Sequence, residues 1–265
     1  MKKIVFILLA YFLFSGSILA KTKIIKDTYY EGQIKFYGLK YNLPEGKWLS
    51  LGKRTEHAGE VPNVGVSCIE FIQLEKKIYK AGVSICEIHT SGTYTNYVGS
   101  YLNYILVKDK YDTCTLRPEY FYAKLWTRGM ASNCFMTRHY DVHKELNFPD
   151  DPEETRTFLN KMIREYSIIM PKTILGSHHV YWAPNVSDKG YEVEYAINPE
   201  FFGAQKTLFG DENASEYHRN NIDKYPEKKK FMLNWTKQSA KRHQEFELNL
   251  RAKGSHKLNF DDLGL

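Results

Sequence analysis

The chain has 265 residues, of which 43% are hydrophobic and 26% charged, and its formal net charge is +6 at pH 7. This composition is typical of a globular protein with an ordinary core. The charge is too small to indicate nucleic-acid binding, which calls for a concentrated basic face. No segment after the first twenty residues is apolar enough to predict a membrane-spanning helix.

The N-terminus predicts export. Lys2 and Lys3 precede an apolar run over residues 4–14, and small residues then lead to Ala20. That order is typical of a secretory signal peptide over residues 1–20, cleaved after Ala20. The short basic opening is typical of bacteria, so we expect a periplasmic or secreted protein. Residues 21–265 are expected to form a single α+β domain, with a possible sub-boundary near residue 150.

The four cysteines lie in a segment rich in strand-forming residues. Residues 64–74 and 79–90 are rich in Val, Ile, Phe and Tyr, which predicts two strands of a hairpin. If the hairpin is centred on Lys77, Cys68 lies directly opposite Cys86. Facing cysteines on paired strands have Cβ atoms near disulfide distance, so the register predicts this bond.

The remaining cysteines, Cys114 and Cys134, are paired only by exclusion. A second hairpin is predicted over residues 120–126 and 132–143, and its register places Cys134 opposite Ala123. Four cysteines allow three connectivities, and the sequence does not choose among them. Four buried thiols are the main alternative in a chain that is not oxidised. Zinc bound by four thiolates is disfavoured, because the C-x2-C spacing is absent.

The other predicted elements follow from proline, glycine and apolar periodicity. We expect strands within residues 28–41 and at 48–51, 173–183 and 190–197, a turn at 43–48, and a loop at 52–63. Helices are expected at 97–106, where a strand is the alternative, and at 151–166, 213–224 and 226–251. The last helix is expected to bury one patchy face, formed by Phe231, Trp235, Ala240 and Phe246, and to expose a basic face, formed by Lys228, Lys229, Lys230, Lys241 and Arg242. The pattern predicts an α+β fold. Antiparallel β-hairpins form one or two sheets, three to four helices pack on them, and disulfides brace the structure.

One constellation could hold a metal ion. His139, Asp141 and His143 fall on one face of the predicted strand, because alternate residues of a strand share a face. The two histidines would be about 13 Å apart, so each could bind a metal only with Asp141 and a ligand from elsewhere. His178 or His179 is the expected donor, and these adjacent residues point to opposite faces. The simpler interpretation is a solvated polar face.

No local motif predicts catalysis by another route. The sequence lacks G-x-S-x-G, H-E-x-x-H, a Gly-rich phosphate loop and a dinucleotide fingerprint, and no cofactor is predicted. Twenty Tyr and four Trp residues could line a groove for sugars or peptides, or simply fill the core. Our first hypothesis is a non-catalytic binding or envelope-associated module whose partner is an envelope component or a small ligand. The alternative is a metal-assisted hydrolase at His139, Asp141 and His143, so the question of catalysis stays open.

Overall fold

The computed structural model describes residues 24–57, 64–90, 114, 120–128, 131–146, 153–182, 189–209, 211 and 213–250. The predicted signal peptide, the predicted helix at 97–106 and the last fifteen residues lie outside these ranges.

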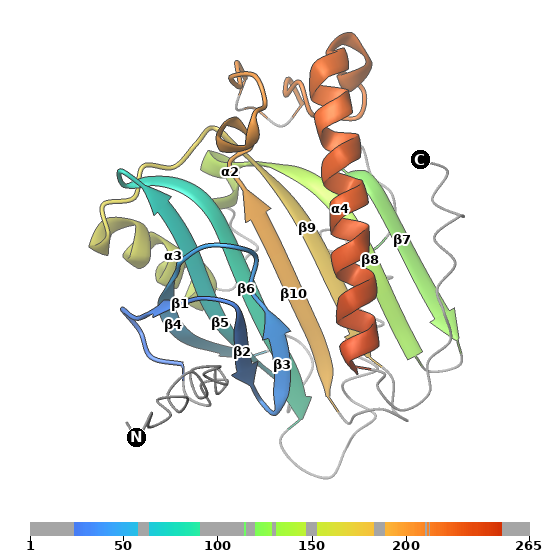
Figure 1. The fold of residues 1–265 in the computed structure, drawn as a ribbon. Helices are drawn as coiled ribbons and strands as arrows, with labels where there is room; N and C mark the ends of the chain where they lie inside the picture. The colour runs from blue at the N-terminus through green and yellow to red at the C-terminus, as the bar shows by residue number, and fades with distance from the viewer. Residues whose placement is uncertain are drawn as a thin grey trace, which may run out of the picture.

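An eight-stranded antiparallel sheet forms the centre of the described structure (Figure 1). In spatial order its strands are β1 (Tyr29–Tyr30), β4 (Trp48–His57), β5 (Val64–Glu75), β6 (Ile78–Thr90), β10 (Gly190–Ile197), β9 (Thr173–Trp182), β8 (Ala131–Asp141) and β7 (Tyr120–Arg128). A small second sheet pairs β2 (Gln33–Phe36) with β3 (Leu39–Asn42). The β9–β10 hairpin comes last in the sequence but lies in the middle of the large sheet, between β6 and β8.

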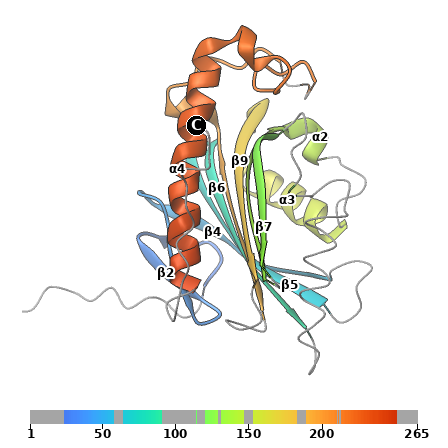
Figure 2. The ribbon, with the colours of Figure 1, turned by 90° about the vertical axis from the view of Figure 1, so that its right-hand side faces the viewer.

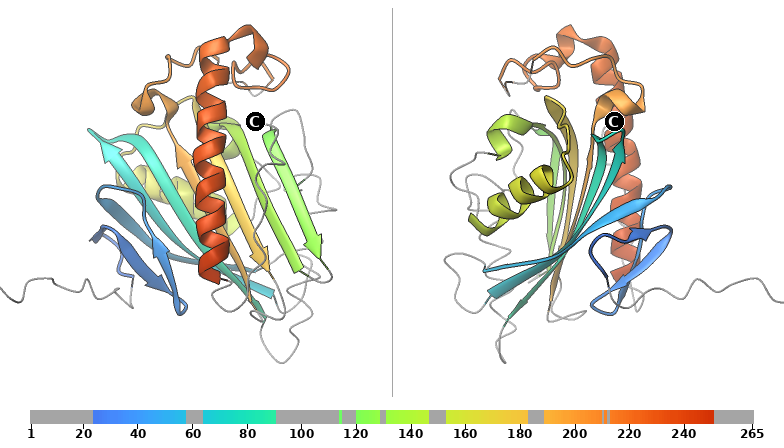
Figure 3. Two further views of the ribbon diagram at one scale, coloured as in Figure 1. Left: turned by 45° about the vertical axis from the view of Figure 1, so that its right-hand side comes forward. Right: turned by 90° about the vertical axis from the view of Figure 1, so that its left-hand side faces the viewer.

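Both faces of the large sheet are covered (Figures 2 and 3). The long helix α4 (Pro226–Leu250) and the β2–β3 pair pack on one face, here called the α4 face. Helices α2 (Val142–Leu146) and α3 (Glu153–Glu165) pack on the other, the α3 face. Two 3-10 helices, η2 (Pro199–Phe202) and η3 (Ile222–Lys224), lie between β10 and α4 in the sequence.

Apolar side chains on each face form the core. Trp48, Phe71, Val193, Trp235 and Phe246 belong to a buried cluster on the α4 face. A second cluster, under α3, includes Leu49, Ile72, Tyr79, Met162 and Ile174. Because strands such as β5 contribute residues to both clusters, they are buried on both faces and show a nearly continuous apolar run.

The first predicted hairpin is confirmed in its register. β5 and β6 pair with Cys68 directly opposite Cys86, and the two Cα atoms are 4.0 Å apart in a disulfide. Lys76 and Lys77, at the turn, have φ angles of 51° and 68°. The backbone conformation of a tight primed turn therefore forms here without glycine or asparagine.

The second predicted hairpin exists, but its predicted register is wrong. Cys134 lies opposite Leu125, not Ala123, because the strands continue to the Arg128–Ala131 pair and the turn falls one residue later. Cys134 forms the second disulfide with Cys114, with Cα atoms 6.1 Å apart. The pairing chosen by exclusion is therefore the one observed.

Several element boundaries differ from the sequence prediction. β4 continues to His57 through the expected loop at 52–63, because Gly52, with φ +98°, accommodates an irregularity in the pairing with β5. The described residues contain two helices longer than ten residues, α3 and α4, where three to four were predicted. Most of the predicted helix at 213–224 consists of turns, and only η3 is helical there. No helix among the described residues combines the length and apolar character needed to cross a bilayer.

Candidate functional site

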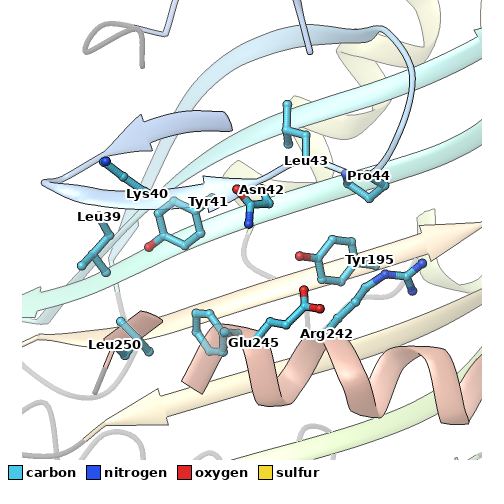
Figure 4. A pocket seen from close by; sticks show the side chains of 11 residues that line it. Leu39, Lys40, Tyr41, Asn42, Leu43, Pro44, Tyr195, Arg242, Glu245 and Leu250 are labelled. Carbon is cyan, nitrogen blue, oxygen red and sulfur yellow. The ribbon is translucent and has the colours of Figure 1, made fainter. Parts of the chain in front are cut away.

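Two adjoining cavities run along α4, and together they form the groove that we consider the candidate site; Figure 4 shows the smaller of the two. Their volumes are about 160 and 320 Å³, and both are lined by Pro44, Tyr195 and Arg242. The smaller cavity lies between β3 and the last turns of α4. The larger lies between the turn before β4, the η2 residue Phe202 and the first half of α4. We call the two cavities together the α4 groove.

A rigid turn forms one wall of the α4 groove. Pro44 and Gly46, at φ +106°, reverse the chain as the sequence predicted. The indole Nε1 of Trp48 donates to the carbonyl of Pro44 at 2.7 Å, and Gln73 Nε2 donates to the carbonyl of Glu45 at 3.1 Å. The turn is therefore fixed both to its own strand and to β5.

The centre of the groove is an arginine between two aromatic rings. The Arg242 guanidinium lies 5.4 Å from the ring centre of Tyr195 and 5.2 Å from that of Trp235, a cation–π arrangement. Burial raises the pKa of Tyr195 to about 12, so its phenol stays protonated at neutral pH. Figure 4 shows the Tyr195 hydroxyl, the Glu245 carboxylate and the Asn42 amide at the same opening.

The larger cavity combines aromatic surface with planar polar groups. Phe202 is 46% exposed, and Phe231 is partly buried beside it. The amides of Asn234 and Gln238 are exposed on the adjacent turns of α4. Among the described residues that line the two cavities, none is a serine, cysteine or histidine. This lining is suited to binding, and it offers no side-chain nucleophile with an adjacent imidazole base.

One edge of β3 also borders the groove. The β2–β3 turn has positive φ at Tyr37 and Gly38. Leu43 N donates to Gly32 O at 2.8 Å, which identifies Gly32 and Leu43 as a hydrogen-bonded pair of the hairpin. Hydrogen-bonded and non-hydrogen-bonded pairs alternate along an antiparallel ladder, so Asn42 and Lys40 belong to non-hydrogen-bonded pairs. Their backbone N–H and C=O groups therefore point away from β2. β3 lies on the α4 side of β2 (Figure 1), and no described strand pairs with this edge.

The three residues predicted to hold a metal lie in different local environments. His139 is 1% exposed on the α4 face, with its ring centre 5.8 Å from that of His218. Asp141 ends β8 and accepts a hydrogen bond from the backbone N–H of His143, which lies in α2 and not on the strand. The face of β8 predicted to be solvated is therefore buried at His139, because α4 and the segment before it pack there.

The expected third ligands do not lie beside His139. His178 and His179 point to opposite faces, as predicted: His178 contacts Glu192 and His179 contacts His243. His179 pairs with Phe135, four residues along β8 from His139. Within the described ranges, no three His, Cys, Asp or Glu side chains lie close enough together to hold a metal ion. A metal at His139, Asp141 and His143 stays a prediction.

A serine–histidine chain that the sequence did not indicate is buried. His179 Nε2 lies 3.1 Å from Ser177 Oγ, and His179 Nδ1 lies 3.2 Å from His243 Nδ1. All three residues have no exposed surface, and none lines the α4 groove. A substrate therefore has no access to the Ser177 hydroxyl, and we interpret the chain as part of the packing between α4 and the sheet.

Comparison of this chain with family models, with curated proteins and with solved structures gave no match. Aromatic richness was a sequence-level signal for the α4 groove. It could not select the residues, because they come from β3, β4, β5, β6, β10, η2 and α4.

Proposed function

We propose that this chain is an exported protein that binds an extended peptide segment in the α4 groove without transforming it. The observation that carries the proposal is a line of two cavities beside a strand edge. The cavities follow α4 from Phe231 to Leu250, a length of roughly 30 Å at 1.5 Å per residue. That length suits an extended chain of several residues better than a compact small molecule.

The edge of β3 supports a peptide over other extended ligands. Backbone groups of Lys40 and Asn42 that point away from β2 can pair with an added strand, and the cavities can receive its alternate side chains. Aromatic side chains such as Phe202 and Phe231 supply large contact surfaces that lose little conformational entropy on binding. Arg242 and Glu245 offer charge of both signs at the same opening.

Export is the other half of the proposal. The basic and apolar order of residues 1–20 supports a cleaved signal peptide, and two disulfides are compatible with an oxidising compartment such as the periplasm or the exterior. The partner would then be a component of the bacterial envelope. No observation on the described residues favours the metal-assisted hydrolase, which stays an alternative from the sequence.

The first prediction tests peptide binding. Peptides selected from a random library on the purified protein are expected to bind Phe202→Ala and Gln238→Ala about ten-fold more weakly than the native protein, because both side chains line the groove. Lys241→Ala, on the same helix but outside the groove, is the matched control and should bind within two-fold of the native protein. Calorimetric titration measures the dissociation constants.

Strand addition has its own signature. Only every second residue of an added strand points its backbone N–H toward the β3 edge. N-methylation of those residues of the selected peptide should therefore abolish binding. N-methylation of the intervening residues, whose N–H groups point away from β3, should leave binding intact. Failure to enrich any peptide, or equal binding to native protein and both groove variants, would overturn the proposal.

A further inference from the structure

A larger cavity lies on the opposite side of the sheet, beneath α3 (Figure 2 shows the two sides). Its volume is about 350 Å³, within the range of small-ligand sites. The sheet forms a polar floor and the helices form an apolar roof. We call the charged and hydroxyl side chains of the floor the polar row: Arg54, Glu70, Ser84, Arg138, Tyr140, His178, Glu192 and Glu194.

Strand register brings the polar row together. Glu70 on β5 lies opposite Ser84 on β6, Ser84 lies opposite Glu194 on β10, and Glu194 lies opposite His178 on β9. Neighbouring strands are about 4.8 Å apart, so four strands place these side chains side by side on the α3 face. Glu192, two residues before Glu194, faces the same way.

Each of the three carboxylates uses one oxygen within the protein. Glu70 Oε1 accepts from Arg54 Nη2 and from Ser84 Oγ, both at 3.0 Å. Glu192 Oε1 lies 2.5 Å from His178 Nε2, and the Tyr140 hydroxyl donates to Glu194 Oε1 at 2.7 Å. Within the described part of the chain, the Oε2 atoms of these three carboxylates have no hydrogen-bond partner, although Glu70 is only 9% exposed.

The carboxylates of the cavity leave acceptor atoms unused. Glu70, Glu192 and Glu194 share the cavity with the guanidinium groups of Arg54 and Arg138 and with the His178 imidazole, which contacts Glu192 through one carboxylate oxygen. Arg54 is paired with Glu70, and the Arg138 guanidinium lies over the Tyr140 ring at 3.9 Å. A ligand that donates hydrogen bonds and carries positive charge would complete this arrangement, because charge-assisted hydrogen bonds are the stronger class.

The local fields act differently on two of the carboxyl groups. Burial raises the pKa of Glu70, against the opposing charge and hydrogen bonds of Arg54 and Ser84. Burial also raises the pKa of Glu192, but His178 outweighs it and holds that pKa below its ordinary value. Glu192 is therefore an anion at neutral pH.

The apolar roof of the cavity favours a ligand with an apolar body. Met162 and Ile163 of α3, together with Met170 just after the helix, present apolar surface across from the polar row. Methionine side chains adapt to irregular shapes, which suits a ligand pocket as well as a core. The cavity is therefore amphipathic, with carboxylate oxygens on one side and methyl and methylene groups on the other.

We propose that this cavity binds a small amphipathic amine, with its ammonium group on the free oxygens of Glu192 and Glu194 and its apolar body under α3. A metal ion fits less well, because the described His, Cys, Asp and Glu side chains include no group of three at metal-binding distances. The site is independent of the α4 groove, which lies on the other face of the sheet.

The second prediction uses three probes of equal length. Hexylamine, protonated at pH 7, is expected to bind at least ten-fold more tightly than hexan-1-ol, and hexanoate is expected not to bind. Glu194→Gln and Glu192→Gln should each weaken hexylamine binding about ten-fold, since each keeps the shape and removes the charge. Isothermal titration calorimetry measures the affinities, and thermal unfolding confirms that each variant is folded.

Two further variants separate the site from general effects. Tyr140→Phe removes the phenol that shares Glu194 Oε1 and keeps the ring, so hexylamine binding should be retained or strengthened. Glu245→Gln removes a carboxylate of the α4 groove and should leave hexylamine affinity unchanged. Equal affinity for amine and alcohol would show an apolar cavity without charge recognition. That result, or retained binding in both glutamine variants, would overturn the proposal.

Discussion

The imidazole of His179 is buried between the sheet and α4. It has no exposed surface, and it contacts Ser177 and His243 beneath α4. Burial lowers its pKa well below the ordinary value of 6.5, and the nearby His243, His178 and Arg242 lower it further. His179 is therefore neutral in the folded protein at pH values where an unfolded chain would begin to protonate it.

The third prediction is a loss of stability in mild acid. Below pH 6.5 the unfolded state binds a proton at His179 that the folded state does not, so the free energy of unfolding falls as pH falls. One such group contributes about 1.4 kcal/mol per pH unit. Urea unfolding at pH 7 and pH 5 measures the effect. His179→Gln should reduce the difference in unfolding free energy between pH 7 and pH 5 by roughly 2 kcal/mol. That value is the slope per pH unit multiplied by the part of the interval that lies below pH 6.5.

A matched control is available at the surface. His143 is exposed in α2, and His143→Gln should keep the pH dependence of the native protein. An unchanged pH dependence in His179→Gln would contradict the assignment of the effect to the buried imidazole.

At the scale of the element, α4 differs from the amphipathic helix that its sequence indicates. Of the predicted buried face, Trp235, Ala240 and Phe246 are buried and Phe231 is only partly buried. Lys228 was predicted to lie outside and is only 4% exposed. Its Nζ donates to the carbonyls of Gln205 and Lys206, both at 3.0 Å, and lies 3.3 Å from Glu216 Oε1. The chain before α4 folds back over the first turn of the helix and covers this lysine.

The fourth prediction compares two lysines of this helix. Lys228→Met leaves the fully buried Glu216 without its counter-charge, so we expect the free energy of unfolding to fall by about 3–5 kcal/mol. Lys230→Met, at an exposed position two residues on, should change it by less than about 0.5 kcal/mol. Urea unfolding of both variants measures the difference, and equal effects would refute the structural role of Lys228.

The two predicted hairpins show when local sequence is enough to predict strand register and when it is not. The β5–β6 register follows from two long apolar runs around Lys77, and Cys68 meets Cys86 as predicted. The β7–β8 register was shifted by two residues, because Arg128 extends its strand and moves the turn. A turn position off by one residue moves every pair by two, so short turn signals limit register prediction.

At the scale of the whole molecule, strand order interleaves the two halves of the sequence. β10 pairs with β6 and β9 pairs with β8, so the β9–β10 hairpin, which follows residue 150, lies between two groups of strands that precede it in the sequence. The possible sub-boundary near residue 150 therefore does not separate two sheets. The single-domain prediction can be tested directly by unfolding.

The fifth prediction is a single cooperative transition. Trp48 reports on the first half and Trp182 on the second, and both are buried. Of the four tryptophans, Trp48 and Trp126 precede residue 150, and Trp182 and Trp235 follow it. Two double variants, Trp48→Phe with Trp126→Phe and Trp182→Phe with Trp235→Phe, therefore each keep tryptophans of one half only. Because the halves share one sheet, the urea midpoint from tryptophan fluorescence should equal the midpoint from far-ultraviolet circular dichroism in each double variant. Fluorescence and circular dichroism midpoints that differ within one variant would indicate separate domains. Disulfides must stay oxidised during the measurement.

The local features could be predicted from the sequence: the strand-forming runs, the turn at Pro44 and Gly46, and the first hairpin with its disulfide. The export signal stays a prediction. These local features depend on residue types that are close together in the chain. Tertiary structure alone decided the α4 groove and the polar row. Glu70, His178 and Glu194 become neighbours only because β5, β6, β10 and β9 lie in that order. Strand order depends on contacts between distant segments, and no periodicity within a segment records it.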